Sequence, residues 1–444
     1  FMSDSQQPET DQRQGATHAE AISIVQRRNL KALEQTLRKQ GRLGQNIVLC
    51  WSPDERGMLV IFVPHYFLGN YCAQSGSGAG TNDNEAFVRE LISGRRQKTR
   101  DELFAIAQRL DISPTFIKLS SPLSEDDNVL ESVEQLIKRY GLSFVNSRAV
   151  ILIDIAEFSL YTPFEQASQL NSMSYSLNSA YNKLLSKGIE INFARTTTGD
   201  GYYVWNRDIG PFASQDLFNF LLLVLADNAA ARAASRGNTV PMIRTAFHIG
   251  SHYELYQAEG VNPTVFSYIV GDVTIELARM VDKAQPRQVL VGSFECDMPS
   301  RERSGVILPV RVKTPGFVRS CNRDLDALVG INLAGKPMTD IDCRLTGEDP
   351  ADTAVEPGRI TITDKHGLNH YAYNLEVVIE TEGDRLALGL GEAEIAHHQE
   401  ADPGADEQAP ATEQQLSRAR AAEAMFDDLA AILKRRNEQS AQRD

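Results

Sequence analysis

The sequence has few cysteines, no long apolar run and fewer basic than acidic residues. Its five cysteines are spaced more than 20 residues apart without a CxxC pair: Cys50, Cys72, Cys296, Cys321 and Cys343. An odd number at this spacing argues against a disulfide framework, and we expect a reducing, cytoplasmic location. The longest apolar stretch, 217–226, is about half of what a bilayer-spanning helix needs, so we expect no membrane span.

The charge balance argues against a nucleic-acid partner. The chain carries 45 Lys and Arg against 59 Asp and Glu, a net charge of −14. Proteins that coat nucleic acid need a basic field, which this composition does not supply. Residues 392–415 hold seven acids and no Lys or Arg, which is half of the net charge. The rest of the chain is only mildly acidic, which leaves room for a basic pocket that binds an anion.

Several common catalytic motifs are also missing. The sequence has no GxSxG, HExxH, HRD or GG[DE]EF motif, and no GxGxxG between a strand and a helix. The glycine-rich stretch 75–85 lacks the GK[ST] ending of a phosphate-binding loop, and we interpret it as a linker. The DKHG segment at 364–367 has the composition of a hairpin turn, and His397 and His398 lie in the acidic stretch.

The chain of 444 residues is about three typical domains long. Composition and periodicity divide it into six segments: a disordered arm at 1–17, an N-terminal α/β region at 18–140, a central region at 141–320, a small β-hairpin module at 337–391, an acidic linker at 392–415, and an amphipathic helix with a tail at 416–444.

The central region predicts an α+β fold. Its expected strands are 149–155, 189–195, 202–205, 242–249 and 288–292, and its expected helices are 164–187, 214–235 and 270–283. The turn TTTGDG makes at least one strand pair antiparallel, which excludes a doubly wound parallel sheet. Flanking patterns predict an N-terminal helix at 19–40, strands at 47–51 and 58–63, helices near 86–93, 97–110 and 126–140, and C-terminal strands at 360–363, 371–379 and 386–391.

Two aspartates stand out in this central region. Asp154 interrupts the buried strand AVILIDI, where a carboxylate is costly unless it is paired or bound to a metal. Asp200 lies at the tip of the hairpin TTTGDGYYV, which can bring it next to Asp154. A divalent cation relieves the repulsion between two carboxylates, and oxygen ligands favour Mg²⁺ or Mn²⁺. Each aspartate alone also fits an ordinary turn or helix cap.

Four blocks in this region resemble the class III nucleotidyl cyclases. The blocks are DIAEFS at 154–159, TTTGDGYYV at 196–204, IRTAFHIGS at 243–251, and YIVGDVTIELARMVDKAQPRQVLVG at 268–292. They occur in the order found in that family, over about 145 residues. The resemblance implies that 141–320 is a cyclase catalytic domain of the palm-like, ferredoxin-type class. It also implies cyclisation of a nucleoside triphosphate with release of pyrophosphate.

The resemblance assigns roles to residues of this chain. It makes Asp154, Asp200 and the main-chain carbonyl of Ile155 the ligands of two Mg²⁺ or Mn²⁺ ions per site. It makes Arg279 the residue that neutralises the transition state, supplied by the opposite subunit of a homodimer with composite sites. The expected substrate-binding residues are Phe158, Ser159, Thr196 and Tyr268.

Three departures from the family pattern bear on the substrate. Thr196 and Tyr268 stand where purine cyclases carry their base-selecting residues, and Ile275 stands at the usual transition-state Asn. Neither purine code is present, so we expect the chain to be similar to the pyrimidine cyclases of the Pycsar anti-phage system. These produce cyclic UMP or cyclic CMP for a separate effector, and UTP is slightly favoured here over CTP. The alternatives are an adenylate or guanylate cyclase with an atypical base pocket, a degenerate cyclase fold that only binds nucleotide, and a diguanylate cyclase.

Overall fold

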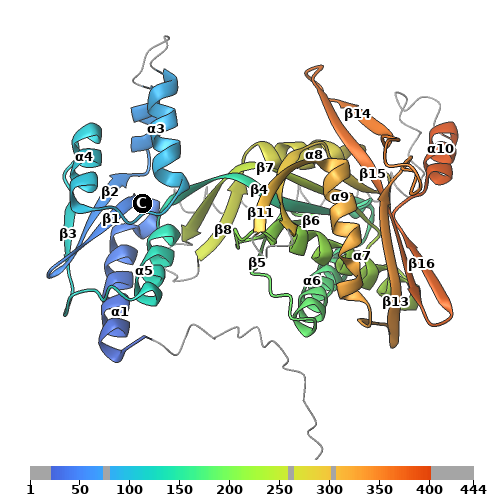
Figure 1. The fold of residues 1–444 in the computed structure, drawn as a ribbon, viewed down its shortest axis with the longest axis horizontal. Coiled ribbons are helices and arrows are strands. Elements are labelled where there is room, and N and C mark those ends of the chain that lie inside the picture. The colour runs from blue at the N-terminus through green and yellow to red at the C-terminus, as the bar shows by residue number, and fades with distance from the viewer. Residues whose placement is uncertain (1–21, 74–80, 259–264, 302–306, 402–444) are drawn as a thin grey trace, which may run out of the picture. The chain divides into compact units, whose positions relative to one another are not determined.

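A computed structural model describes residues 22–73, 81–258, 265–301 and 307–401 (Figure 1). The predicted arm at 1–17 and the predicted helix and tail at 416–444 lie outside these residues. The chain divides into two compact units. Of the described residues, those within 22–148, 194–196 and 249–275 form the first unit, and those within 149–193, 197–248 and 276–401 form the second.

The first unit is built on a small antiparallel sheet in the order β1-β2-β3. Its elements are α1 (Ile24–Gln40), β1 (Asn46–Asp54), β2 (Gly57–Pro64), α2 (Phe67–Ala73), α3 (Thr81–Ser93), α4 (Arg100–Leu110), β3 (Thr115–Lys118) and α5 (Asp127–Arg139). Alternate strand residues supply two hydrophobic clusters, one with α1 and α5 and the other with α3 and α4 (Figure 1). The sheet is therefore covered on both faces, as its apolar strands predict.

The long β-sheet of the structure has the order β12-β13-β15-β9-β7-β4-β6-β5, with β14 and β16 paired to β15 and β8 paired to β7. Its strands are β4 (Leu142–Ile155), β5 (Phe193–Thr197), β6 (Gly201–Asn206), β7 (Ile243–Ala258), β8 (Val265–Val270), β9 (Val289–Gly292), β12 (Asn332–Leu333), β13 (Lys336–Leu345), β14 (Arg359–Thr363), β15 (Asn369–Thr381) and β16 (Asp384–Leu388). β7 and β9 are parallel, whereas β4–β6, β7–β8 and β9–β15 are antiparallel. The mixed sheet confirms the predicted α+β class.

The remaining elements are helices and one short ribbon. They are the 3₁₀ turns η1 (Arg42–Gly44), η2 (Phe158–Leu160) and η3 (Leu325–Leu328), the helices α6 (Pro163–Ser186), α7 (Ala213–Ala234), α8 (Asp272–Lys283), α9 (Thr314–Arg323) and α10 (Glu392–Ala401), and the ribbon of β10 (Glu295–Arg301) and β11 (Ile307–Lys313). Thr162 starts α6 with a capping box, in which its hydroxyl accepts from the N–H of Glu165. The N-terminus of α6 is therefore fixed directly after η2.

Helix α7 is the core helix of the second unit. Phe218 of α7 lies 5.4 Å from Phe247 of β7 and 5.7 Å from Phe317 of α9, measured between ring centroids. Phe294 joins the same aromatic cluster. Among the described residues, α7 is the one helix that is long and apolar enough to cross a membrane, and most of its apolar side chains are buried within the fold.

The C-terminal hairpins continue the sheet of the central region. Ala372 of β15 pairs with Gly292 of β9, and Asn374 pairs with Leu290. Asn374 is buried, and its side-chain amide donates to the hydroxyl of Thr346 at 2.7 Å and to the carbonyl of Leu390 at 2.7 Å. The segment 337–391 is thus joined to β9 by main-chain strand pairing, and the Asn374 side chain links parts of the segment to one another.

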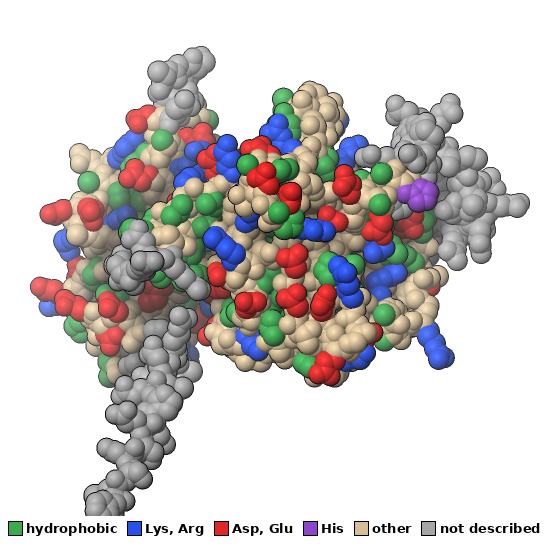
Figure 2. Space-filling model, turned by 45° about the vertical axis from the view of Figure 1, so that its right-hand side comes forward, with side chains coloured by type: hydrophobic (Ala, Val, Ile, Leu, Met, Phe, Trp, Pro, Cys, Tyr) green, Lys and Arg blue, Asp and Glu red, His purple; other side chains and the backbone are tan. Residues whose placement is uncertain are grey.

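Two expectations from the sequence need correction. The strand expected at 189–195 begins later, at Phe193, where the N–H of the preceding Asn192 donates to the side-chain oxygen of Asn206 at 3.2 Å and not to the main chain of a neighbouring strand. The acidic stretch expected to be a linker begins with helix α10, whose first turn carries Glu392 and Glu394, where acidic side chains favour a helix. Figure 2 shows acidic and basic side chains interspersed on the face in view.

Candidate active site

The structure brings the two predicted aspartates together at the ends of β4 and β6. Asp154 pairs with Gly201 in the β4–β6 ladder, so Asp200 precedes the residue directly opposite Asp154. The carbonyl of Asp200 accepts the N–H of Ile155 at 2.9 Å. The carboxylate of Asp200 accepts the hydroxyl of Thr198 at 3.2 Å, which fixes it within the turn.

Gly201 allows this close approach. A Cβ atom at position 201 would lie 1.9 Å from the carbonyl oxygen of Ile153, well inside van der Waals contact. The neighbouring Gly199 has a φ of +102°, which side chains rarely adopt. The glycines of TTTGDG are therefore required by the geometry that places Asp200 beside Asp154.

Burial and charge act in opposite directions on Asp154. The residue is only 7% exposed, and burial raises the pKa of its carboxyl group above the ordinary value. The guanidinium of Arg244 opposes this shift, while the nearby carboxyl of Asp200 raises the pKa further. The carboxyl of Asp154 is thus buried beside a second carboxyl, that of Asp200, and beside the guanidinium of Arg244.

Arg244 supplies a cation in this structure, and the sequence reasoning gave it no role. Its Nε donates to Oδ2 of Asp154 at 2.6 Å. Arg244 lies on β7, which is next to β4 in the sheet. In the sequence, Arg244 belongs to the block IRTAFHIGS, and an arginine in this strand was the signal that could have predicted a partner for the buried Asp154. The guanidinium thus contacts one of the two oxygens of the Asp154 carboxylate.

The donor set fits a divalent cation that prefers oxygen ligands. Asp154 and Asp200 offer carboxylates, Ile155 offers a main-chain carbonyl, and Arg244 shows that a positive charge is accommodated beside Asp154. Among the residues that the structure describes, no group of three or more His, Cys, Asp and Glu side chains could hold a metal ion. The two aspartates with main-chain oxygen are therefore the candidate metal ligands.

The other predicted site residues are distributed over both units. Phe158 is half-buried and Ser159 is exposed, both on η2 of the second unit. Thr196 and Tyr268 belong to the first unit, where Thr196 is half-buried on β5 and Tyr268 is 38% exposed on β8. Ile275 on α8 is 46% exposed, so no packing role explains an apolar side chain there.

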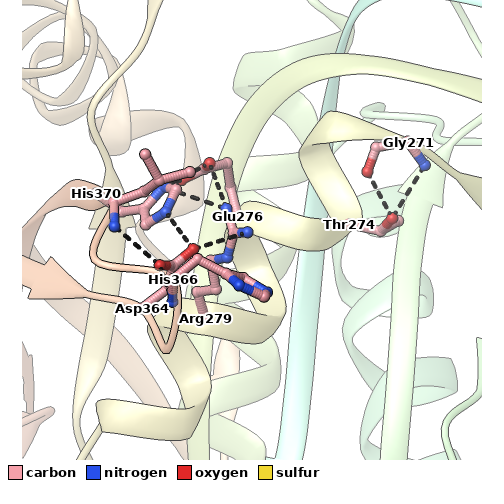
Figure 3. Close-up of polar contacts among 8 residues, drawn as sticks. Gly271, Thr274, Glu276, Arg279, Asp364, His366 and His370 are labelled. Atoms are coloured by element: carbon pink, nitrogen blue, oxygen red, sulfur yellow. Dashed lines mark hydrogen bonds and ion pairs between the residues drawn. The ribbon is translucent and has the colours of Figure 1, made fainter.

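Arg279 on α8 contacts the C-terminal hairpin. Its Nη2 lies 3.0 Å from Oδ2 of Asp364, in the turn between β14 and β15 (Figure 3). The described contacts of Arg279 within the single chain include neither Asp154 nor Asp200. The sequence interpretation of DKHG as a turn is correct, but it missed the contact between Asp364 and Arg279.

Replacing Gly201 by alanine is expected to separate the two aspartates. The new methyl group must displace the backbone of β4 or β6, and overpacking of this kind costs about 1–3 kcal/mol of unfolding free energy. We expect a lower unfolding midpoint and weaker Mn²⁺ binding by calorimetry. Gly210→Ala is the matched control, because a Cβ there meets no atom within 4 Å. Equal effects of the two substitutions would contradict the requirement for a close β4–β6 approach.

Comparison with known proteins gives structural likeness only. No family model and no curated protein matches the sequence. The fold is similar to the catalytic core of a rhodopsin-guanylyl cyclase with converted specificity (12% identity, 53% of this chain and 97% of that chain, TM-score 0.32). It is also similar to the guanylate cyclase domain of RhGC from Catenaria anguillulae (13% identity, 52% and 97%, TM-score 0.32). A third is the adenylyl cyclase CyaB from P. aeruginosa (13% identity, 39% and 94%, TM-score 0.25).

Proposed function

We propose that this protein is a nucleotidyl cyclase that converts UTP, or CTP, to the 3′,5′-cyclic monophosphate and pyrophosphate. The observation that carries the proposal is that Asp154 pairs with Gly201, which brings the carboxyl of the preceding Asp200 close to that of Asp154, in a site that accommodates the cationic side chain of Arg244. The resemblance of four sequence blocks to class III cyclases gives this pair its chemical interpretation.

In the proposed reaction, the 3′-oxygen of the ribose attacks the α-phosphorus. The O3′–Pα bond forms, the bond from Pα to the bridging oxygen breaks, the hydroxyl proton is released, and pyrophosphate leaves. Two Mg²⁺ or Mn²⁺ ions, held by Asp154, Asp200 and the carbonyl of Ile155, would lower the pKa of the attacking hydroxyl and neutralise the triphosphate.

The chain's own residues have separate tasks in this proposal. Arg279 donates its N–H groups to the oxygens that gain charge as the bond breaks, which commonly contributes several kcal/mol. Phe158 and Ser159 contact the substrate, and Thr196 and Tyr268 select the base. Arg244 must share or release Asp154 when a cation binds, since both approach the same carboxylate.

The quaternary and biological parts of the proposal rest on the resemblance. We propose a homodimer in which Arg279 of one subunit serves the aspartates of the other. We further propose that the product is a second messenger in antiviral defence that a separate effector binds, as the similarity to Pycsar cyclases implies.

A second candidate is a nucleotide-binding regulator that does not catalyse cyclisation. Arg244 is ion-paired to Asp154, Arg279 is ion-paired to Asp364, and Ile275 replaces the usual asparagine. The two ion pairs engage charged groups that the reaction needs, and Ile275 lacks the polar side chain of the usual asparagine. Incubation of the full chain with Mn²⁺ and each of the four triphosphates, followed by chromatography, distinguishes the two functions, because a regulator retains the triphosphate unchanged.

Base selectivity tests the pyrimidine part of the proposal. Lys or Glu at position 196 would recognise a purine edge by charge, whereas Thr196 is neutral and the ring of Tyr268 fills space that a purine needs. An unpaired buried polar group costs about 1–3 kcal/mol, so we expect kcat/KM for UTP or CTP to exceed that for ATP or GTP by about tenfold or more.

The double variant Thr196→Lys with Tyr268→Asp is expected to reduce that preference. Thr361→Ala on β14 is the control, because Thr361 lies outside the proposed site. Thr198→Ala is not suitable, because the hydroxyl of Thr198 contacts Asp200. ATP as the preferred substrate of the unmodified chain would refute the pyrimidine assignment and leave a purine cyclase with an atypical pocket.

A further inference from the structure

The turn between β14 and β15 presents a fixed carboxylate to α8. Oδ1 of Asp364 accepts the N–H groups of His366 at 2.8 Å and Leu368 at 2.9 Å. The N–H of Gly367 donates to the carbonyl of Asp364 at 3.0 Å, at a residue whose φ of +79° suits glycine. The hydrogen bond from the Leu368 N–H is the main cause that lowers the pKa of the Asp364 carboxyl, so the group is an anion held by its own turn.

That turn leaves the other oxygen of Asp364 free to bind Arg279. Oδ2 lies 3.0 Å from Nη2 of Arg279, and the Asp364 side chain is only 6% exposed (Figure 3). One carboxylate oxygen thus serves the turn and the other serves the guanidinium. A guanidinium has five N–H donors, so the contact of Nη2 with Asp364 and the longer contact of Nη1 with Glu276 still leave donors for another anion.

His370 and Glu276 complete the cluster around Arg279. Nδ1 of His370 lies 2.8 Å from Oε1 of Glu276 and 3.5 Å from Nη1 of Arg279, and Nε2 lies 3.4 Å from Oδ2 of Asp364. Nδ1 cannot donate to Glu276 and accept from Arg279 at once, and the shorter contact identifies it as the donor to Glu276. His370 therefore links Glu276 on α8 to the hairpin, which fixes the two walls between which Arg279 lies.

We propose that Asp364 and His370 are positioning residues that hold the Arg279 guanidinium ready for the triphosphate. This inference rests on the proposed function of Arg279. A free arginine side chain samples many rotamers, and ordering it at the moment of reaction costs free energy. The buried contact to Asp364 orders it in advance, so the C-terminal hairpin contributes to catalysis without touching the substrate.

If Asp364 instead withheld Arg279 from the substrate, its replacement would raise activity. A carboxylate bound to Arg279 also competes with phosphate, and release of a competing carboxylate would raise activity. The cluster carries two carboxylates, Asp364 and Glu276, against Arg279 and His370. We favour positioning because Asp364 makes only one contact of 3.0 Å to the guanidinium, and Glu276 lies farther away at 3.6 Å.

The variant Asp364→Asn tests the inference in the full-length chain. Asparagine keeps an Oδ1 that accepts the N–H groups of the turn, so the substitution changes chiefly the oxygen that faces Arg279. We expect kcat for UTP with Mn²⁺ to fall about 10- to 100-fold with little change in KM, since a misplaced transition-state group affects kcat. His370→Gln is expected to show a smaller loss of the same kind.

Thr363→Ala is the matched control. It removes the hydrogen bond from Thr363 to Asn369 at 2.8 Å in the same hairpin without touching the cluster, and it is expected to retain wild-type kcat. A thermal double-mutant cycle gives a readout independent of activity. Once Arg279 is alanine, replacing Asp364 by Asn should no longer shift the unfolding midpoint, because their contact is already absent.

Three results would overturn the inference. Unchanged kcat in Asp364→Asn shows that the contact only secures the hairpin, and increased kcat shows that it withholds Arg279. Additive shifts in the thermal cycle show that the two residues do not interact. A wild-type chain that forms no cyclic nucleotide refutes the proposed function itself. This outcome differs from failure of the inference, because turnover is then absent before any substitution is made.

Discussion

Asp154→Asn is expected to abolish cyclic-nucleotide formation. The carboxylate is a proposed ligand of the catalytic cations, and the amide that replaces it is neutral. Metal coordination contributes several kcal/mol of charge stabilisation in such reactions. A loss of about 3–4 kcal/mol corresponds to roughly 10²- to 10³-fold in kcat. Asp200→Asn should have a similar effect, measured as product formed from UTP with Mn²⁺.

The structure alters what this substitution should do to stability. From the sequence, removing one of two repelling carboxylates is expected to stabilise the chain. The structure adds Arg244, whose side chain is 28% exposed and pairs with Asp154. Loss of the ion pair opposes the relief of repulsion by Asp200, so the unfolding midpoint should change little.

Asp227→Asn is a matched control for an ion pair of similar burial. Asp227 pairs with Lys183 in the contact between α6 and α7, and its side chain is 10% exposed. Its replacement should leave kcat near the wild-type value. Turnover above about 10% of wild type in Asp154→Asn or Asp200→Asn would contradict the assignment of these two aspartates as metal ligands.

Mixing two inactive variants should restore activity if the site is composite. Asp154→Asn lacks a metal ligand and Arg279→Ala lacks the transition-state cation, so each homodimer should be inactive. A mixed dimer has one site with both defects and one with neither. With random exchange, half of the dimers are mixed and half of their sites are intact, so we expect about a quarter of wild-type activity.

Subunit exchange must be measured in the same sample. Two differently tagged variants that co-purify after mixing establish that mixed dimers form. Activity that stays at the level of the separate variants, despite exchange, would show that Asp154 and Arg279 act within one subunit. As a further control, Asp154→Asn mixed with Asp200→Asn should stay inactive, because both defects lie in the same metal site.

Local sequence patterns predicted most of the elements and the Asp154–Asp200 pair. The apolar run before Asp154 identified β4, and the glycines around Asp200 identified the turn. Both signals lie within a few residues of the feature that they predict. The cost of a carboxylate in a buried strand and its expected repulsion with Asp200 then suggested a metal.

The partners of the two arginines were beyond such patterns. Asp154 and Arg244 are 90 residues apart in sequence, and Arg279 and His370 are 91 apart. Residues so far apart in sequence are not related by the periodicity of a helix or a strand. Only the tertiary fold brings these side chains together. The β10–β11 ribbon was missed for another reason, since β11 is largely exposed and lacks a buried apolar face.

The pairing of β15 with β9 covers one edge of β9, and this edge would be exposed if the C-terminal hairpins were removed. β9 has β7 on one side and β15 on the other, so its backbone N–H and C=O groups face strands on both sides. A catalytic region cut away from the C-terminal hairpins would leave one side of β9 open, with Leu290 and Val291 in the exposed row. Open edges with apolar side chains recruit strands from other molecules. The C-terminal hairpins therefore also protect the sheet against aggregation, a role that is independent of any chemistry at Arg279.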